Sequence, residues 1–282
     1  MAIGKIAKNY KDLERLYPIK RRIRSIVRDT AIFVLSARSN IDSSKEWIRI
    51  PYYHHVFDDE RSDFERHLRY LKNYGDFISL DTVVDIFKEK KIGGCYFCVT
   101  FDDGFKNCVS NALPILVENE CPAAFFIPTD CIGSDIGKDS ETIRSFFSTA
   151  TDYPMPIDFL DWDDCRKLLE AGMTIGSHTC SHVPLSRLNN DQLRSELLRS
   201  KQKIEKELAI DCLHFAPPWE TSGNTFGTAA YLIVVKETGY RSLLTTERGP
   251  NYNGTSPFKI RRDNVTAKWG NYQLRYFFSK RF

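Results

Sequence analysis

Residues 95–104 read Cys-Tyr-Phe-Cys-Val-Thr-Phe-Asp-Asp-Gly, a mainly apolar run that ends in two adjacent carboxylates. Apolar continuity up to Phe101 is typical of a strand that is buried on both faces, as in a parallel sheet. On a regular strand Asp102 and Asp103 would point to opposite faces. Because Gly104 allows the backbone to leave the strand, both carboxylates can turn toward one site.

Two carboxylates at the end of a buried strand are costly unless a cation or strong hydrogen-bond donors neutralise them. A polar turn in which one aspartate caps the following helix would give the same pattern, because aspartate is a common helix cap. The local residues alone therefore leave two interpretations open, a charged site and a capped turn.

A second candidate set consists of His178 and His182, whose spacing places two imidazoles on one side of a helical turn. With one carboxylate they make the two-histidine set that is typical of catalytic zinc. The spacing alone is a weak indicator, since two structural histidines would also give it. It gains weight because the pair follows an expected strand at residues 173–177, as the aspartates follow theirs. His67 and His214 are expected to be structural.

Strand-like and helix-like patterns alternate on both sides of this stretch, which predicts βαβ units and a mainly parallel sheet of the α/β class. The expected strands are residues 47–53, 77–80, 95–101, 123–127, 173–177, 213–216, 240–245 and 258–261. The expected helices begin at Ser62 or Asp63, Asp81, Asp163, Asn190 or Asp191, and Thr228, and one more runs through Leu113 and Leu116. We expect one domain at residues 46–282 and a basic N-terminal extension at residues 1–45.

The composition excludes several classes of protein. The chain has 282 residues, of which 42% are hydrophobic and 27% charged, so disordered and fibrous proteins are excluded. No run approaches the roughly 18 apolar residues of a membrane span, and the N-terminus does not resemble a secretory signal. Eight cysteines at irregular spacing favour reduced thiols over a disulfide framework. We therefore expect a cytoplasmic protein.

Charge is unevenly distributed along the chain. Residues 1–28 have a net charge of +7, whereas the whole chain has +3, so the rest of the chain has a net charge of −4. An acidic body of this kind does not predict a nucleic-acid partner. A stripe of side chains at helical spacing runs through the extension. It consists of Ile19, Ile23, Ile26, Val27, Thr30 and Val34. Such stripes usually face a core, and we expect this one to pack on the body. The alternative is contact of residues 1–37 with a membrane surface.

In α/β proteins the chemistry gathers at the carboxyl ends of the strands. Four candidate points follow directly on expected strands, namely residues 54–55, 100–104, 178–182 and 217–219. The first is a histidine pair with acids close behind it. It could transfer protons, since histidine is the side chain most used for that work, or it could form surface ion pairs.

Together these motifs resemble the polysaccharide deacetylases, the NodB-homology domain of carbohydrate esterase family four. Three signatures occur in order at strand ends, and the sequence between them also matches the family. The resemblance covers about residues 47–265. The signatures are TFDDG (100–104), SHTCSH (177–182) and FAPPW (215–219). The connecting matches are YYHHV (52–56), YGDFISL (74–80), PAAFFIP (122–128) and LDWDDCRKLLEAGMTIGSHT (160–179).

The resemblance implies a distorted (β/α)7 barrel and a metal-dependent hydrolase of carbon–nitrogen bonds. It implies that Asp103, His178 and His182 bind a divalent metal ion and that Asp102 is the general base. We expect zinc, with cobalt, nickel and ferrous iron as alternatives, because two histidines and an aspartate suit all four metals.

The chain departs from the common family pattern in two places. Ala216 stands where the third signature usually has arginine, and the late Leu-x-His motif is missing. Both departures resemble a permuted subgroup that includes the poly-N-acetylglucosamine deacetylases. In that subgroup His54 would be the general acid and Arg262 would replace the missing guanidinium. Trp219 and Pro218 would line the substrate groove, and the backbone N–H of Trp219 would help to hold the oxyanion.

The expected activity is removal of an acyl group, N-acetyl first, from an aminosugar or glycan in envelope or surface polysaccharide metabolism. The expected partner is a carbohydrate substrate, and the location is cytoplasmic or peripheral to the inner membrane surface. The alternatives are a deformylase or other amidase acting on a lipid- or nucleotide-linked aminosugar, and a catalytically silent glycan-binding domain.

Overall fold

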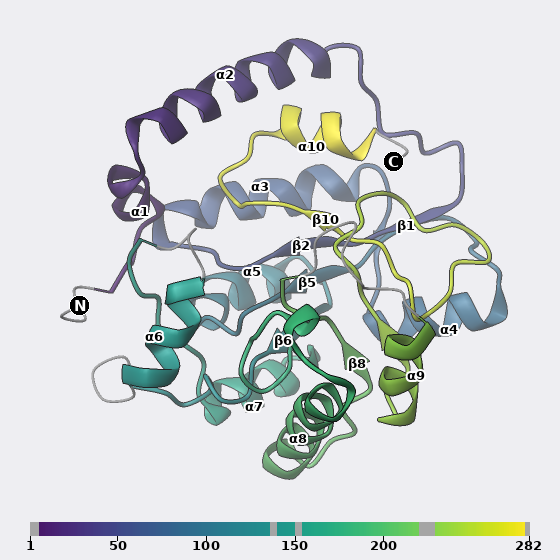
Figure 1. The fold of residues 1–282 in the computed structure, drawn as a ribbon. Helices are drawn as coiled ribbons and strands as arrows, with labels where there is room; N and C mark the ends of the chain where they lie inside the picture. Colours follow the sequence, from purple (N-terminus) through teal and green to yellow (C-terminus); the bar gives the residue numbers. More distant parts are fainter. Residues whose placement is uncertain (1–5, 136–139, 150–153, 220–228, 280–282) are drawn as a thin grey trace.

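The computed structural model describes residues 6–135, 140–149, 154–219 and 229–279. Its centre is a curled sheet of seven parallel strands in the order β10-β2-β5-β6-β7-β8-β9 (Figure 1). The strands are β2 (Pro51–Tyr53), β5 (Val99–Phe101), β6 (Ala123–Ile127), β7 (Thr174–Ser177), β8 (His214–Phe215), β9 (Ser242–Leu243) and β10 (Asp263–Asn264). This architecture confirms the α/β class and the distorted barrel.

A small second sheet has the order β1-β4-β3, with β1 (Trp47–Arg49), β3 (Asp76–Phe77) and β4 (Cys95–Phe97). Two runs that the sequence predicts as single strands therefore belong to two sheets, and that prediction is wrong. The chain passes from one sheet to the other at Ile50 and Cys98, which are both fully buried. The backbone N–H of Cys98 donates to the Arg49 carbonyl at 3.1 Å, so pairing continues across the break.

Helices cover both sides of the main sheet. Figure 1 shows α7 and α8 on one side, and α3, α10 and α2 on the other. The helices are α1 (Tyr10–Leu16), α2 (Ile19–Ser36), α3 (Arg61–Lys72), α4 (Leu80–Glu89), α5 (Leu113–Glu118), α6 (Ser140–Thr149), α7 (Trp162–Glu170), α8 (Asn190–Leu208), α9 (Ala229–Glu237) and α10 (Asn271–Phe278). A π-helical turn at Cys108–Ala112 precedes α5, and short 3-10 turns lie at Asp58–Glu60 and Leu185–Arg187.

Two predicted boundaries are wrong for identifiable reasons. Helix α4 begins one residue before Asp81, because the Ser79 hydroxyl accepts the backbone N–H of Thr82 at 3.2 Å and caps the helix there. The strand expected at residues 258–261 is reduced to a single bridge at Ile260. The last strand of the sheet is β10 instead, which pairs with β2.

Helix α2 packs against α10 through the helix face opposite to the one that the sequence analysis expected. The Ser36 hydroxyl accepts Nη2 of Arg275 at 3.1 Å, and Oδ1 of Asp29 accepts Nε2 of Gln273 at 3.2 Å. Ile32, on the same side of the helix, is buried. The stripe from Ile19 to Val34 faces outward, so the prediction that it packs on the body is wrong.

No helix in the described ranges is both long and apolar enough to span a membrane. Residues 1–5 of the basic extension lie outside the described part of the chain.

His67 on α3 connects this helix to the central sheet and to the C-terminal segment. Its Nε2–H donates to the Trp269 carbonyl at 2.6 Å, and its Nδ1 accepts the Tyr53 hydroxyl at 3.2 Å. The ring is fully buried beside Phe64 and Leu68 of the same helix, which confirms its structural role. Burial lowers the pKa of His67 to about 4.

We predict a specific acid sensitivity from His67. The unfolded chain binds this proton below about pH 6.5 and the folded protein only near pH 4. Stability is therefore lost as the pH falls through this window, by about 2 kcal/mol for this residue between pH 7 and pH 5. Urea unfolding at both pH values should show a smaller loss for His67→Gln than for the wild type. An equal loss in the two proteins would contradict the assignment.

Candidate metal centre

The carboxylates at the end of β5 are positioned by a sharp change in the backbone. Asp103 and Gly104 both have left-handed φ angles, 72° and 68°, so the chain leaves the strand at Asp103 itself. A Cβ atom at Gly104 would lie 3.1 Å from Cδ1 of Ile132, which leaves little room for a side chain there. Asp102 and Asp103 are both buried, and of the two interpretations that the local sequence left open, the structure favours the charged site.

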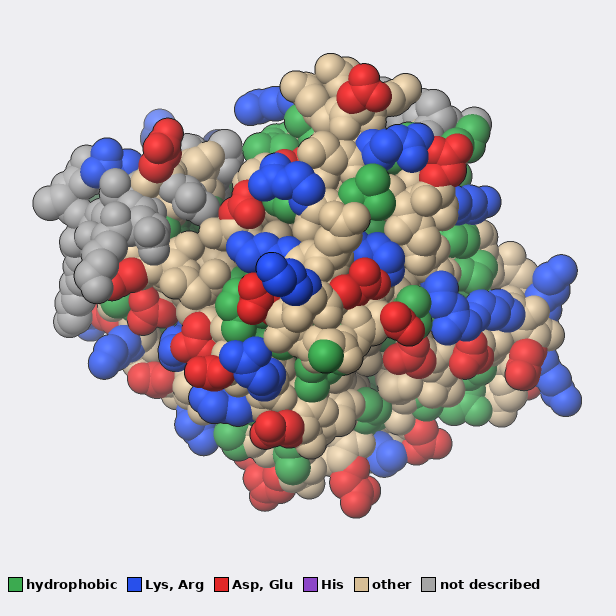
Figure 2. Space-filling model, turned by 90° about the horizontal axis from the view of Figure 1, so that it is seen from below, with side chains coloured by type: hydrophobic (Ala, Val, Ile, Leu, Met, Phe, Trp, Pro, Cys, Tyr) green, Lys and Arg blue, Asp and Glu red, His purple; other side chains and the backbone are tan. Residues whose placement is uncertain are grey.

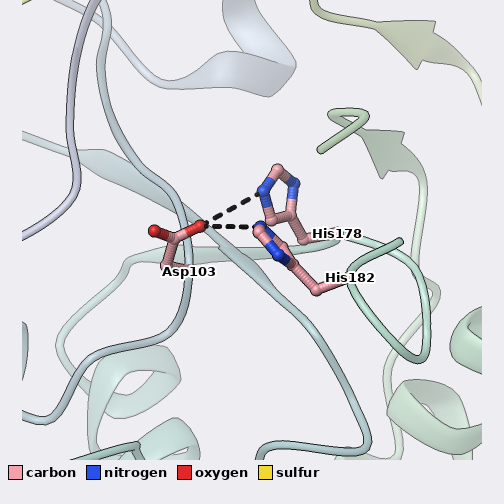
Figure 3. A group of neighbouring side chains, drawn as sticks. All are labelled: Asp103, His178 and His182. Atoms are coloured by element: carbon pink, nitrogen blue, oxygen red, sulfur yellow. Dashed lines mark ion pairs between the residues drawn. The ribbon is translucent and has the colours of Figure 1, made fainter. Parts of the chain in front are cut away.

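His178 and His182 follow β7 in a loop and not in a helical turn, so the helical reason given for their spacing is wrong. Thr179 and His182 have left-handed φ angles of 69° and 55°, which fold the loop back on itself. The Nε2 atoms of the two histidines lie 3.5 Å and 3.1 Å from Oδ1 of Asp103 (Figure 3). One ligand atom from each residue falls within 4.8 Å of the other two, and all three side chains are buried.

The hydrogen bonds around these residues fit a metal ion. Nδ1–H of His178 donates to the Ala216 carbonyl at 2.6 Å, so Nε2 of the neutral ring carries a lone pair that faces Asp103. Fixing the outer nitrogen in this way is how metal-binding histidines are commonly oriented. Two acceptor atoms that face each other at this distance repel unless a cation lies between them. The donor set therefore suits a divalent metal ion, and its identity is left open by the geometry.

The pKa shifts of the candidate ligands also favour metal binding. Burial acts to raise the pKa of Asp103, but without a metal ion the protonated rings of His178 and His182 would donate to this carboxylate and outweigh burial, so the pKa lies well below its usual value. Burial lowers the pKa of His182, although Asp103 opposes that shift. An ionised carboxylate and a neutral imidazole are the protonation states that metal binding requires.

Asp102 forms a buried ion pair with Arg262, 160 residues later in the chain. Nη1 of Arg262 lies 2.7 Å from Oδ1 of Asp102, and Nε donates to the Thr245 carbonyl at 3.0 Å. The guanidinium carbon is 4.3 Å from the centre of the Tyr52 ring. Because β10 lies beside β2 and β2 beside β5, the order of the sheet brings the two charges together.

The two neighbouring histidines after β2 have separate surroundings. Burial lowers the pKa of His54, while the charges of Asp103 and Asp102 oppose the shift, so this ring lies within the field of both carboxylates. Nδ1 of His55 instead pairs with Oε2 of the buried Glu60 at 3.3 Å. The resemblance selects His54 and not His55, and of the two rings it is His54 that experiences the charges of both carboxylates; its role as the acid stays a prediction.

The aromatic wall of the site includes one expected residue and one that sequence reasoning missed. Nε1–H of Trp219 donates to the His182 carbonyl at 2.9 Å, and its ring is 38% exposed, whereas Pro218 is buried. Phe146 of α6 lies with its ring centre 4.4 Å from that of His182. Ile143 and Phe146 are three residues apart, a helical spacing that could have indicated α6, which the sequence reasoning did not predict.

Residues 83–242, more than half of the chain, match the family model described as polysaccharide deacetylase. The chain belongs to the polysaccharide deacetylase family. Among curated relatives, this deacetylase-family chain is 23% identical to YxkH of Bacillus subtilis over 208 residues, which is 73% of this chain and 65% of YxkH.

The solved structures that share the fold of this family member include two that are similar over most of its length. IcaB from Ammonifex degensii aligns with a TM-score of 0.68 and 20% identity, over 84% of this chain and 98% of IcaB. A de-N-acetylase from Aggregatibacter actinomycetemcomitans aligns with a TM-score of 0.62 and 17% identity, over 82% of this chain and all of that chain.

We predict that Asp103→Asn removes metal binding and leaves the fold intact. Asparagine tolerates the left-handed backbone but lacks the charge of the carboxylate. The loss of affinity should exceed the roughly 10- to 100-fold that follows removal of a residue supporting a ligand. Elemental analysis and calorimetric titration with zinc, cobalt and nickel measure it. The control is Asp163→Asn, whose side chain is 77% exposed. Stoichiometric metal in Asp103→Asn would contradict the assignment.

Proposed function

We propose that the protein removes an N-acetyl group from an aminosugar or glycan in a metal-dependent hydrolysis. The observation that carries the proposal is the convergence of Asp103, His178 and His182 beside the buried pair of Asp102 and Arg262. Two histidines and one aspartate leave coordination positions open for the reacting groups, as in catalytic zinc sites. Family membership supports the reaction class, and a polymer or an envelope precursor is the proposed substrate.

A divalent metal held by the three ligands, zinc by this proposal, with cobalt, nickel or iron as alternatives, would act as a Lewis acid toward the amide carbonyl. Asp102 is the proposed general base, which accepts a proton from the attacking water. Its Oδ1 is held by Arg262, so the carboxylate keeps one orientation in a buried environment. Arg262 is thus a positioning residue for the base.

His54 is the proposed general acid. An amine leaves poorly as an anion, so the nitrogen of the substrate needs a proton when the carbon–nitrogen bond breaks. The ring of His54 lies within the field of both carboxylates. The backbone N–H of Trp219 is proposed to donate to the oxyanion, and the left-handed φ of Trp219, 58°, belongs to a tight turn next to His182. Trp219, which is 38% exposed, is proposed to line the substrate groove, whereas the expected contact of Pro218 with the substrate is not proposed because Pro218 is buried.

The proposed location is the cytoplasm, either free or peripheral to the inner membrane surface. All eight cysteines are free thiols in the structure, which supports a reducing compartment.

We predict that the metal-loaded protein releases acetate from N-acetylated sugars. A panel of N-acetyl and N-formyl aminosugars, free, nucleotide-linked and polymeric, would be assayed for released acid and for new free amine. Asp163→Asn should retain the activity and Asp103→Asn should lose it. Release of formate instead of acetate would contradict the proposed removal of an N-acetyl group and would indicate a deformylase. Binding without release of acid would favour the silent glycan-binding alternative.

We predict that His54→Ala separates catalysis from metal binding. Metal content should remain as in the wild type, because the metal is held by three other residues. Turnover should fall by roughly 100- to 10,000-fold, the effect of losing a general acid. The matched control is His55→Gln, which alters the neighbouring ring that pairs with Glu60. Full activity in His54→Ala would contradict the role.

A further inference from the structure

Helix α2 carries an apolar surface that faces away from the protein. We call it the outer stripe, and it consists of Ile19, Ile23, Ile26, Val27 and Val34. These side chains are between 55% and 72% exposed, although they recur at the spacing of one helix face. Burial of large aliphatic side chains is normally favourable, so a continuous exposed row of this length indicates an interaction surface.

The outward direction of the outer stripe is set by contacts on the other side of the helix. Ser36 and Asp29 bond to Arg275 and Gln273 of α10, and Ile32 is buried there. Helical periodicity places these residues nearly opposite the outer stripe. Figure 1 shows α2 outermost on its side of the molecule, in agreement with the exposure of all five side chains of the outer stripe.

The charges of α2 indicate which partner the outer stripe fits. The helix has five cations and one acid, Asp29, which already bonds to Ser25 and Gln273. The cations are Lys20, Arg21, Arg22, Arg24 and Arg28. By helical periodicity Lys20 and Arg24 flank the outer stripe on one side and Arg22 on the other. The face seen from below differs, because Figure 2 shows acidic and basic side chains interspersed over it.

We propose that α2 docks on an anionic lipid bilayer. The helix would lie flat, with the outer stripe at the boundary between headgroups and acyl chains and the flanking cations against lipid phosphates. An amphipathic helix with a basic polar face has these properties. A second copy of the chain fits less well, because it would bring an equally basic helix against this one. The proposal does not depend on the proposed enzymatic function.

The test is co-sedimentation of the full chain with vesicles of phosphatidylcholine, with and without phosphatidylglycerol. We expect binding to the anionic vesicles that weakens as salt is added. The variant I23Q/I26Q/V27Q should bind at least about 100-fold less well, because three apolar side chains no longer enter the lipid. The variant K20Q/R24Q should lose roughly fivefold per cation.

The matched control is V117Q/I233Q, which removes two apolar side chains of 52% exposure on other helices and should bind as the wild type does. Circular dichroism and melting curves should be unchanged in every variant, because the altered side chains are exposed. Equal binding to neutral and anionic vesicles, or wild-type binding by I23Q/I26Q/V27Q, would overturn the proposal. So would a dimer in sedimentation velocity that this variant dissociates, if no vesicle binding accompanies it.

Discussion

Oδ1 of Asp103 faces the Nε2 atoms of His178 and His182, and the loops at the carboxyl ends of β5 and β7 are organised around this contact. The three groups come from two strand ends, and each of the two loops uses left-handed residues to turn its side chains inward. Such conformations cost about 1–3 kcal/mol each for residues other than glycine. They persist because the surrounding sheet and the hydrogen bond from His178 to the Ala216 carbonyl hold the loops in place.

The ion pair of Asp102 and Arg262 is the second constraint, and it links the site to the last strand of the sheet. Both side chains are almost entirely buried, so removal of either one would leave an uncompensated charge in the interior. The pair therefore couples the position of the carboxylate to correct assembly of β10 against β2. The guanidinium also packs over Tyr52, which leaves it little freedom to move away from Asp102.

The two helices of the N-terminal extension differ in their contacts with the rest of the protein. Leu13 of α1 is buried in the same apolar cluster as Phe105 and Phe146, and the ring of Phe146 packs on His182. The beginning of the chain thus supports one wall of the metal centre. Helix α2 then packs on α10 with Asp29, Ile32 and Ser36 inward, leaving the outer stripe exposed. A helical period alone identifies such a stripe but does not reveal which side meets the body.

Local features of the sequence were sufficient for the α/β class and for a buried strand that ends before Asp102, because periodicity is a property of neighbouring residues. The ligand set of Asp103, His178 and His182 came from the resemblance, since local patterns left a capped turn and structural histidines open. The role of Arg262 came from resemblance, since no local pattern connects residues 160 positions apart. Tertiary structure alone decided the break of two strands at Ile50 and Cys98, the pairing of His55 with Glu60, and the outward direction of α2. Each depends on contacts between distant segments. The strand breaks in particular are invisible locally, because a buried apolar residue gives the same sequence pattern whichever sheet its strand joins.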